Sequence, residues 1–173
     1  MIKMSSSTTE KDMGWKHIKT EVKKFKGAYT AVGYFTGMSQ GLLTKAWVNE
    51  MGAKIPVTPR MRWWWLFNFG VMLKKTIITI PSRPFMRQTF EQNKNRITAV
   101  IAKELNMIYD GVSTAKMSIS RIGEWYTGQV KRIFRTGNFT ANSSATAAKK
   151  KSSRPLIDSG ELRNSVTHRE FNI

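Results

Sequence analysis

The sequence contains no cysteine among its 173 residues, and it has only two histidines, His17 and His168. The absence of cysteine excludes disulfide bridges, zinc sites built on thiolates and thiol nucleophiles. Its 11 acidic residues are scattered and never grouped, which argues against a two-carboxylate hydrolase or a two-metal nuclease. We therefore expect a protein that is not an enzyme and that needs no metal and no cofactor.

Long hydrophobic runs are also missing. The longest apolar run covers residues 63–69 and is interrupted by Asn68, far short of the roughly 20 residues that a membrane-spanning helix needs. We expect no membrane partner. The hydrophobic content of 40%, with nine Phe and six Trp, still predicts a real core. Length and composition together favour one domain over residues 14–173, preceded by a flexible arm at 1–13.

Basic residues dominate the charge, and they are unevenly placed. The formal net charge is +18; residues 54–87 hold seven basic residues and no acid, and residues 116–154 hold nine with a single acid, Glu124. Two positive blocks separated by nearly balanced sequence suit a polyanion or an acidic protein surface. Ordinary solubility charge is the alternative interpretation.

Hydrophobic periodicity predicts an α+β fold, a small antiparallel sheet packed by several helices of which two are long. The expected helices cover residues 15–27, 42–51 and 60–69, then run from a Ser82 cap to about 109 and from about 113 to 135. Strands are expected at 28–35, 76–80 and 163–171, with an extended stretch at 55–57. Residues 136–153 lack periodicity and predict a mobile loop without regular structure.

The first long helix shows a clear apolar spacing. We expect its core face to be formed by Met86, Phe90, Ile97, Ile101, Leu105 and Ile108.

Three consecutive tryptophans, Trp63, Trp64 and Trp65, form the most unusual patch, together with Phe67. Consecutive helical residues point about 100° apart, so the three indoles cannot all face one core. An assembly interface is the interpretation we favour. Ordinary core, a membrane surface and a base-stacking platform are the alternatives.

Three segments resemble a known family in their order along the chain. They are VGYF (32–35) with VNEMG (48–52), IPSRPFMR (80–87), and PLIDSGELRNSV (155–166). This ordered set resembles the neck and tail-completion proteins of tailed bacteriophages, including the Mu-like virion morphogenesis group. Met51, Ser82 and Ser159 depart from the family pattern, which has Phe, Pro and Thr there.

The resemblance implies a structural virion protein at the head–tail junction, made in the host cytoplasm. It implies a homo-oligomeric, hexameric ring that binds a portal, adaptor or connector protein on one side and a tail terminator or tail tube on the other, with genomic DNA passing through. Pro155, Leu156 and Ile157 are then candidate docking residues, while Asp158 and Gly160 form a turn.

The basic residues divide by chemistry. Lys149, Lys150 and Lys151 are candidate DNA-channel residues, because lysine makes weak and geometry-tolerant contacts. The candidate contacts to acidic partners are Arg60, Arg62, Arg83 and Arg87, because arginine can clamp a carboxylate with two hydrogen bonds. A stand-alone nucleic-acid-binding protein that uses the basic blocks and exposed aromatics is the alternative function.

Overall fold

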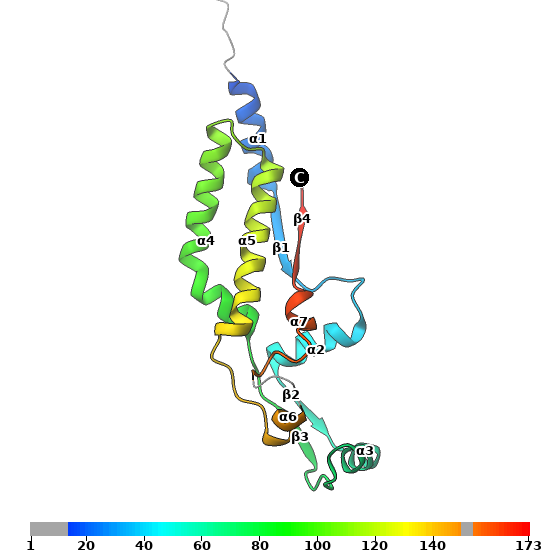
Figure 1. Cartoon of the computed structure of the whole chain (residues 1–173). Coiled ribbons are helices and arrows are strands. Elements are labelled where there is room, and N and C mark those ends of the chain that lie inside the picture. Colours follow the sequence, from blue (N-terminus) through cyan, green and yellow to red (C-terminus); the bar gives the residue numbers. More distant parts are fainter. Residues whose placement is uncertain (1–13, 150–153) are drawn as a thin grey trace, which may run out of the picture.

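The computed structural model describes residues 14–149 and 154–173, and its elements confirm the α+β class (Figure 1). The predicted N-terminal arm, residues 1–13, lies outside the described residues. In chain order the elements are α1 (Trp15–Gly27), β1 (Tyr29–Gly33), α2 (Gln40–Met51), β2 (Ala53–Pro56), α3 (Pro59–Phe69), β3 (Ile77–Ile80), α4 (Phe85–Tyr109), α5 (Ala115–Thr136), α6 (Ser144–Lys149), α7 (Glu161–Asn164) and β4 (Thr167–Phe171).

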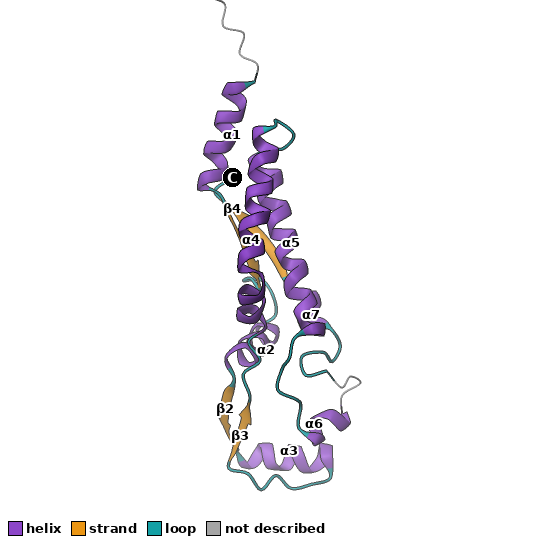
Figure 2. Cartoon of the chain, turned by 90° about the vertical axis from the view of Figure 1, so that its left-hand side faces the viewer, coloured by secondary structure: helices purple, strands orange, loops and turns teal. Residues whose placement is uncertain are grey.

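The molecule is elongated, with the long helices α4 and α5 side by side along its axis (Figures 1 and 2). The strands form two separate antiparallel pairs where we expected one sheet: β1 with β4 beside α5, and β2 with β3 at the far end, next to α3. The body and the far end are therefore built around different strand pairs.

A buried ion pair joins the two long helices near their connecting loop. Arg121 on α5 donates from Nε and Nη2 to Glu104 Oε2 on α4, at 2.9 and 2.7 Å, and Glu104 is buried. The hydroxyl of Ser118 donates to the Glu104 carbonyl at 3.4 Å. The two bonds from Arg121 satisfy a carboxylate that would otherwise be costly to bury.

The core face of α4 agrees only in part with the apolar face expected from sequence, because Ile108 is buried and Met86 packs against the core, but other members are exposed. Phe90 is 50% exposed and Ile101 is 39% exposed, whereas the polar residues Thr89 and Asn93 are buried. Their side chains donate to carbonyls of the preceding turn, Thr89 Oγ1 to Phe85 at 2.7 Å and Asn93 Nδ2 to Thr89 at 2.9 Å. Polar groups satisfied in this way can be buried at little cost, so hydrophobicity alone placed Phe90 and Ile101 wrongly and left out Thr89 and Asn93.

The β1–β4 pair crosses α5 at a glycine. The register sets Tyr29 opposite Phe171 and Gly33 opposite Thr167, and α5 packs on both strands. Gly123 marks the close approach, because a Cβ there would stand 2.5 Å from Thr30 Oγ1 and 2.6 Å from His168 Cδ2. Glycine lowers the helix propensity of this stretch, but the absence of a side chain at Gly123 allows the two strands to pack closely on α5.

Replacing this glycine is expected to destabilise the fold. Gly123→Ala should lower the free energy of unfolding by about 1–3 kcal/mol, because the methyl group overlaps two side chains and helix and sheet must separate. Gly128→Ala in the same helix is the control: nothing lies within 4 Å of its added Cβ, and the gain in helix propensity predicts a stabilisation of up to about 1 kcal/mol. Urea denaturation measures both, and equal changes would contradict the close approach.

The main hydrophobic core lies where the N-terminus of α4 and the C-terminus of α5 meet α2 and α7. Phe85 is 1% exposed at its centre, and its ring lies 4.8 Å from that of Phe134 and 6.3 Å from that of Tyr34. The buried members are Leu42, Ala46, Phe85, Val130, Ile133, Phe134, Leu156, Leu162 and Val166.

Three further sequence predictions are corrected. Residues 136–153 are not without regular structure, because α6 spans Ser144–Lys149. The strand expected at 163–171 begins only at Thr167, after the helical turn α7. Ser82 does not cap α4: the residue before that helix is Pro84, and the Ser82 hydroxyl donates instead to the Glu50 carbonyl at 2.7 Å.

Helix α1 is anchored to the body by a buried carboxylate. Glu21 is 6% exposed and accepts hydrogen bonds from the Lys24 ammonium at 2.7 Å and from the amide of Ala115 at 2.9 Å. The Lys24 hydrogen bond, followed by that from Ala115, holds the pKa of the Glu21 carboxyl below its ordinary value of 4.5. Ala115 is the first residue of α5, so this carboxylate also sits at a helix N-terminus.

This depressed pKa gives stability a defined pH dependence. The ionised Glu21 stabilises the folded state above pH 4.5, and that contribution is lost as the pH falls through the lower folded-state pKa. Glu21→Gln should therefore lower stability at neutral pH and flatten its decline in acid. Glu91→Gln is the control, because the exposed pair with Lys94 is worth only about 0–1 kcal/mol. Thermal unfolding across pH measures both; identical pH profiles of wild type and Glu21→Gln would contradict the anchor.

Candidate assembly surfaces

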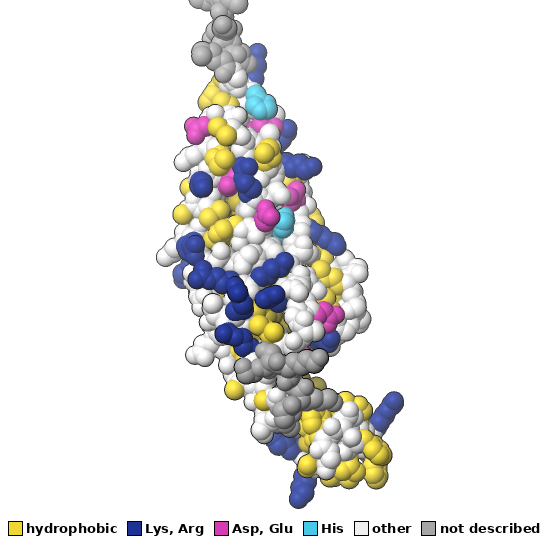
Figure 3. Space-filling view, in the orientation of Figure 1, with side chains coloured by type: hydrophobic (Ala, Val, Ile, Leu, Met, Phe, Trp, Pro, Cys, Tyr) yellow, Lys and Arg dark blue, Asp and Glu magenta, His cyan; other side chains and the backbone are white. Residues whose placement is uncertain are grey.

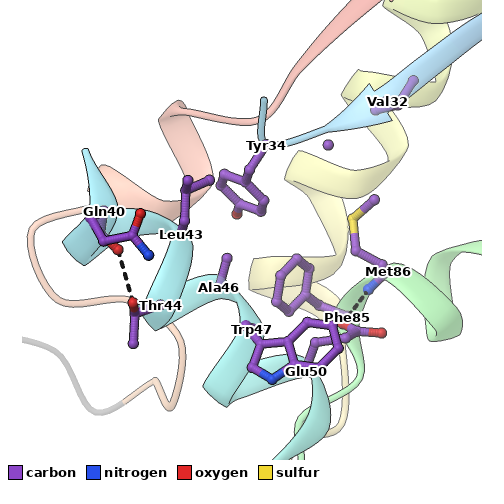
Figure 4. Close-up of a pocket in the computed structure, with 11 residues that line it drawn as sticks. Val32, Tyr34, Gln40, Leu43, Thr44, Ala46, Trp47, Glu50, Phe85 and Met86 are labelled. Carbon is purple, nitrogen blue, oxygen red and sulfur yellow. Dashed lines mark hydrogen bonds between the residues drawn. The ribbon is translucent and has the colours of Figure 1, made fainter. Parts of the chain in front are cut away.

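The first two family-like segments are hydrogen-bonded to each other. Glu50, at the end of α2, accepts from the amides of Met86 at 2.9 Å and Arg87 at 3.1 Å, in the first turn of α4 (Figure 4). The amide of Arg83 also donates to the Asn49 carbonyl at 2.7 Å. Glu50 thus caps a helix that follows it by more than thirty residues, with its negative charge at the positive end of the helix dipole.

The third family-like segment, near the C-terminus, packs against the first two. Leu156, Leu162 and Val166 are buried in the core around Phe85. The hydroxyl of Tyr34, in the first segment, donates to the Leu162 carbonyl at 2.7 Å. Burial, and next the charge of Glu50, raise the pKa of Tyr34, which keeps the hydroxyl protonated as a donor. The family-like segments, far apart in sequence, form one structural joint, which we call the motif joint (residues 32–35, 48–52, 80–87 and 155–166).

This placement corrects part of the predicted docking surface. Leu156 is 6% exposed and belongs to the core, so it is not available to a partner. Ile157 is half-buried and packs against the same core, and Pro155 is half-buried beside it. Leu156 therefore acts inside the subunit, while Pro155 and Ile157 keep part of their surface exposed.

The expected turn after them is present. Asp158 is exposed, and Gly160 adopts a φ of 82°, in the left-handed region that favours glycine. The Ser159 hydroxyl accepts from the amide of Glu161 at 3.3 Å, which helps to start α7. The turn reverses the chain between two core residues, Leu156 and Leu162.

Arg83 was expected to contact an acidic partner, and the structure corrects this. It is 7% exposed, and its guanidinium donates to the carbonyls of Thr140 at 2.8 Å and Ala141 at 3.3 Å, and to the side-chain oxygen of Asn142 at 3.2 Å. Burial lowers the pKa of this guanidinium. Arg83 therefore ties the segment after α5 to the motif joint.

An apolar groove of about 620 Å³ opens beside the motif joint (Figure 4). Tyr34, Leu43 and Met86 line it, and Trp47, 67% exposed, also lines it. The carboxylate of Glu50 also lines the groove but is already engaged by the α4 amides. The groove can accept apolar side chains.

The predicted tryptophan helix projects at the far end of the molecule. Thr58 caps α3 by accepting from the Met61 amide at 3.3 Å, Pro59 follows as the first helical residue, and Gly70 ends the helix. No residue of α3 is buried. We call residues 53–80, which comprise β2, α3 and β3, the aromatic module; apart from the pairing of β2 with β3, it makes few contacts with the other elements.

The tryptophans lie outside the main core, where their spacing predicted at least one of them. Trp63 is 56% exposed, Trp64 53% and Phe67 82%, while Trp65 is half-buried and stacks on Phe69 at 4.3 Å. Figure 3 shows hydrophobic side chains gathered over this lower end, with Lys and Arg at its edges. The module contains no acidic residue.

The remaining predicted cations lie apart from each other. Arg60 is exposed on α3 and lines a small cavity with Trp64, whereas Arg62 is half-buried and donates to the Leu73 carbonyl at 2.8 Å. Arg87 is exposed on α4. Lys149 is the last residue of α6, and Lys150 and Lys151 lie outside the described residues.

Sequence reasoning missed two contacts that matter for these surfaces. One is the capping of α4 by Glu50, which local spacing cannot reveal because the helix is remote in sequence. The other is the cation–π contact in which the Arg96 guanidinium lies 5.9 Å from the centre of the Trp125 ring, bridging α4 and α5.

Comparisons with known proteins add no family assignment. No protein-family model matches the chain, and no curated protein or solved structure does either. Within residues 14–149 and 154–173, no three His, Asp or Glu side chains gather as a metal-ligand set. Over the same residues, no helix is both long and apolar enough to cross a bilayer.

Proposed function

We propose that this chain is a structural virion protein at the bacteriophage head–tail junction, a neck or tail-completion subunit that forms a ring. One observation carries the proposal: the three segments that resemble the family converge on one joint, where Glu50 caps α4 and Leu156 and Leu162 complete the core. Segments that resemble a family by accident have no reason to meet in space. Their convergence supports a shared fold.

The aromatic module supports an assembly role for the subunit. A soluble monomer rarely exposes so many large aromatic side chains together, and tryptophan is enriched at the centres of protein interfaces. The module extends from the lower end of the body on two strands, with α6 beside it, and no residue of α3 is buried, so α3 can reach a neighbour without disturbing the core (Figure 2). We assign it to the contact with the next subunit of the ring.

Loss of the protein tests the proposal directly. A phage lacking the gene should produce filled heads and separate tails that fail to join, and the wild-type gene supplied in trans should restore joined particles. Electron microscopy and infectivity counts measure the outcome. Normal infectious particles without the protein would overturn the proposal, as would its absence from purified virions.

If the aromatic module forms the subunit contact, replacing one exposed tryptophan should weaken assembly more than it weakens folding. Trp63→Ala should cost about 2 kcal/mol or more of assembly free energy if Trp63 is a hot spot, while the isolated subunit loses less stability. Trp15→Ala is the control, since Trp15 is 63% exposed on α1 at the opposite end. Analytical ultracentrifugation measures assembly and thermal melting measures stability. Unfolding of the Trp63→Ala subunit, with no specific assembly defect, would show that the indole serves the fold.

A further inference from the structure

A second surface of different chemistry runs along the long helices. Residues 92–103 of α4 and 125–136 of α5 contain no acidic residue. We call the set Arg96, Lys131, Arg132 and Arg135 the basic ridge. Figure 3 shows Lys and Arg side chains gathered over the lower halves of α4 and α5, on the face toward the viewer.

The charges of the basic ridge are not neutralised within the subunit. Arg121, about three turns before Arg132 on the same side of α5, is paired with Glu104. Within the part of the chain that the structure describes, none of the four ridge residues forms an ion pair. Arg96, Arg132 and Arg135 are exposed, and Lys131 is half-buried. Free cations of one sign raise the local potential and attract a polyanion.

One residue of the ridge is held in position. The Arg96 guanidinium lies 5.9 Å from the centre of the Trp125 ring, so a side chain of α4 is fixed beside those of α5. This contact restricts the guanidinium while leaving the residue exposed. A pre-positioned cation loses less conformational entropy when it binds an anion.

The ridge lacks the apolar centre that a protein interface has. Among the described residues, no large hydrophobic side chain of α5 after Met117 is exposed. The exposed Phe90 and Ile101 of α4 are six and five residues from Arg96, which at about 100° per residue places both on other sides of the helix. Protein interfaces bury an apolar core, whereas protein–DNA interfaces are more polar and strongly positive. The ridge therefore fits DNA better than an acidic protein.

We propose that the basic ridge binds the phosphate backbone of duplex DNA, by charge neutralisation and without reading base edges. The inference rests on the proposed function, which supplies the duplex as the genome that passes through the ring. It places the DNA-facing surface on α4 and α5. Binding of this kind depends steeply on salt, because each neutralised phosphate releases counterions.

The test compares two variants of equal charge. The ridge variant carries Arg96→Gln, Arg132→Gln and Arg135→Gln; the control carries Lys19→Gln, Lys23→Gln and Lys26→Gln, all exposed on α1. The probe is a fluorescent duplex of random sequence, titrated by anisotropy over a range of salt concentrations. Thermal melting confirms that both variants fold.

We expect the ridge variant to bind about tenfold or more weakly at low salt, and its log–log salt slope to be shallower by about 3. The α1 control should stay close to wild type. Equal losses in both variants would show that bulk charge binds the duplex, and unchanged binding in the ridge variant would show that the ridge does not; either overturns the inference. So would a ridge variant that binds DNA normally but fails to join heads to tails, because the ridge would then face a protein.

Failure of the ridge and failure of the proposed function give different results. If the chain is found in the neck of virions but the ridge variant binds DNA like wild type, only the ridge assignment falls. If the ridge variant loses DNA binding but the chain is absent from virions, the ridge stands and the neck assignment falls.

Discussion

Arg83→Met should lower the free energy of unfolding by about 1.5–3 kcal/mol, because it removes the buried guanidinium whose charged hydrogen bonds hold residues 140–142. The guanidinium donates to the carbonyls of Thr140 and Ala141, to the amide oxygen of Asn142 and, at 3.4 Å, to that of Asn49. Methionine keeps much of the volume but provides no donor. Hydrogen exchange should also accelerate in residues 138–143, which Arg83 ties to the body.

Arg87→Met is the matched control, because Arg87 belongs to the same segment but is exposed. A surface substitution of this kind changes stability by less than about 0.5 kcal/mol. Chemical denaturation of both variants gives the comparison. If Arg83→Met and Arg87→Met were equally stable, the guanidinium would have to be solvated and free for a partner, as sequence alone had indicated.

Phe85→Ala should cost about 3–5 kcal/mol, enough to unfold a marginally stable domain at physiological temperature. Phe85 is 1% exposed and lies between the rings of Tyr34 and Phe134. Removing its ring opens a cavity where the first two family-like segments and α5 meet. The loss should appear as a lower midpoint in urea with an unchanged denaturant slope.

Phe90→Ala makes the same chemical change on the same helix, five residues later. Phe90 is 50% exposed, so the variant should lose no more than about 1 kcal/mol. The two variants together test which face of α4 is buried. The apolar periodicity of the sequence predicts the larger loss at Phe90, and the structure predicts it at Phe85.

Local chemistry was enough to predict several elements. Thr58 and Pro59 start α3 and Gly70 ends it, as the capping rules require. The amphipathic spacing after Trp15 predicted α1 as it is found. In both cases every determining residue lies within or beside the element, so no tertiary information was needed.

Contacts between remote segments could not be predicted in the same way. The sequence indicates that Arg83 is a surface cation. Its acceptors lie at residues 140–142, in a stretch with no periodic pattern, so nothing in the sequence places them next to it. Thr89 and Asn93 read as solvent-facing because their hydrogen bonds to the helix backbone are invisible in sequence. Burial of a polar group depends on its partner, and these partners are set by tertiary structure.

The candidate surfaces also divide into those that local sequence predicts and those that depend on contacts between remote segments. Exposure of the tryptophans followed from helix geometry alone, since 100° per residue forces at least one indole out of a single core. The docking role expected for Leu156 failed because the turn at Gly160 folds that segment back into the body. The basic ridge could not be identified from sequence alone, because Arg96 lies on α4 and the other three residues lie on α5, and only the packing of the two helices brings them to one surface.

The pairing of β2 with β3 determines where this chain can tolerate insertions and replacements in its sequence. Ala53 and Ile80 stand opposite each other at one end of the strand pair, so the chain leaves the body and returns to it at neighbouring points, and Pro56 and Ile77 stand opposite each other at the other end. For the fold of the body, lengthening or replacing the twenty residues between Pro56 and Ile77 costs mainly the entropy of closing a loop, about 0.6 kcal/mol for each doubling of its length. Such a site behaves as an insertion point: its contents can diverge between related chains, or be exchanged by recombination, while the motif joint and the long helices stay as they are.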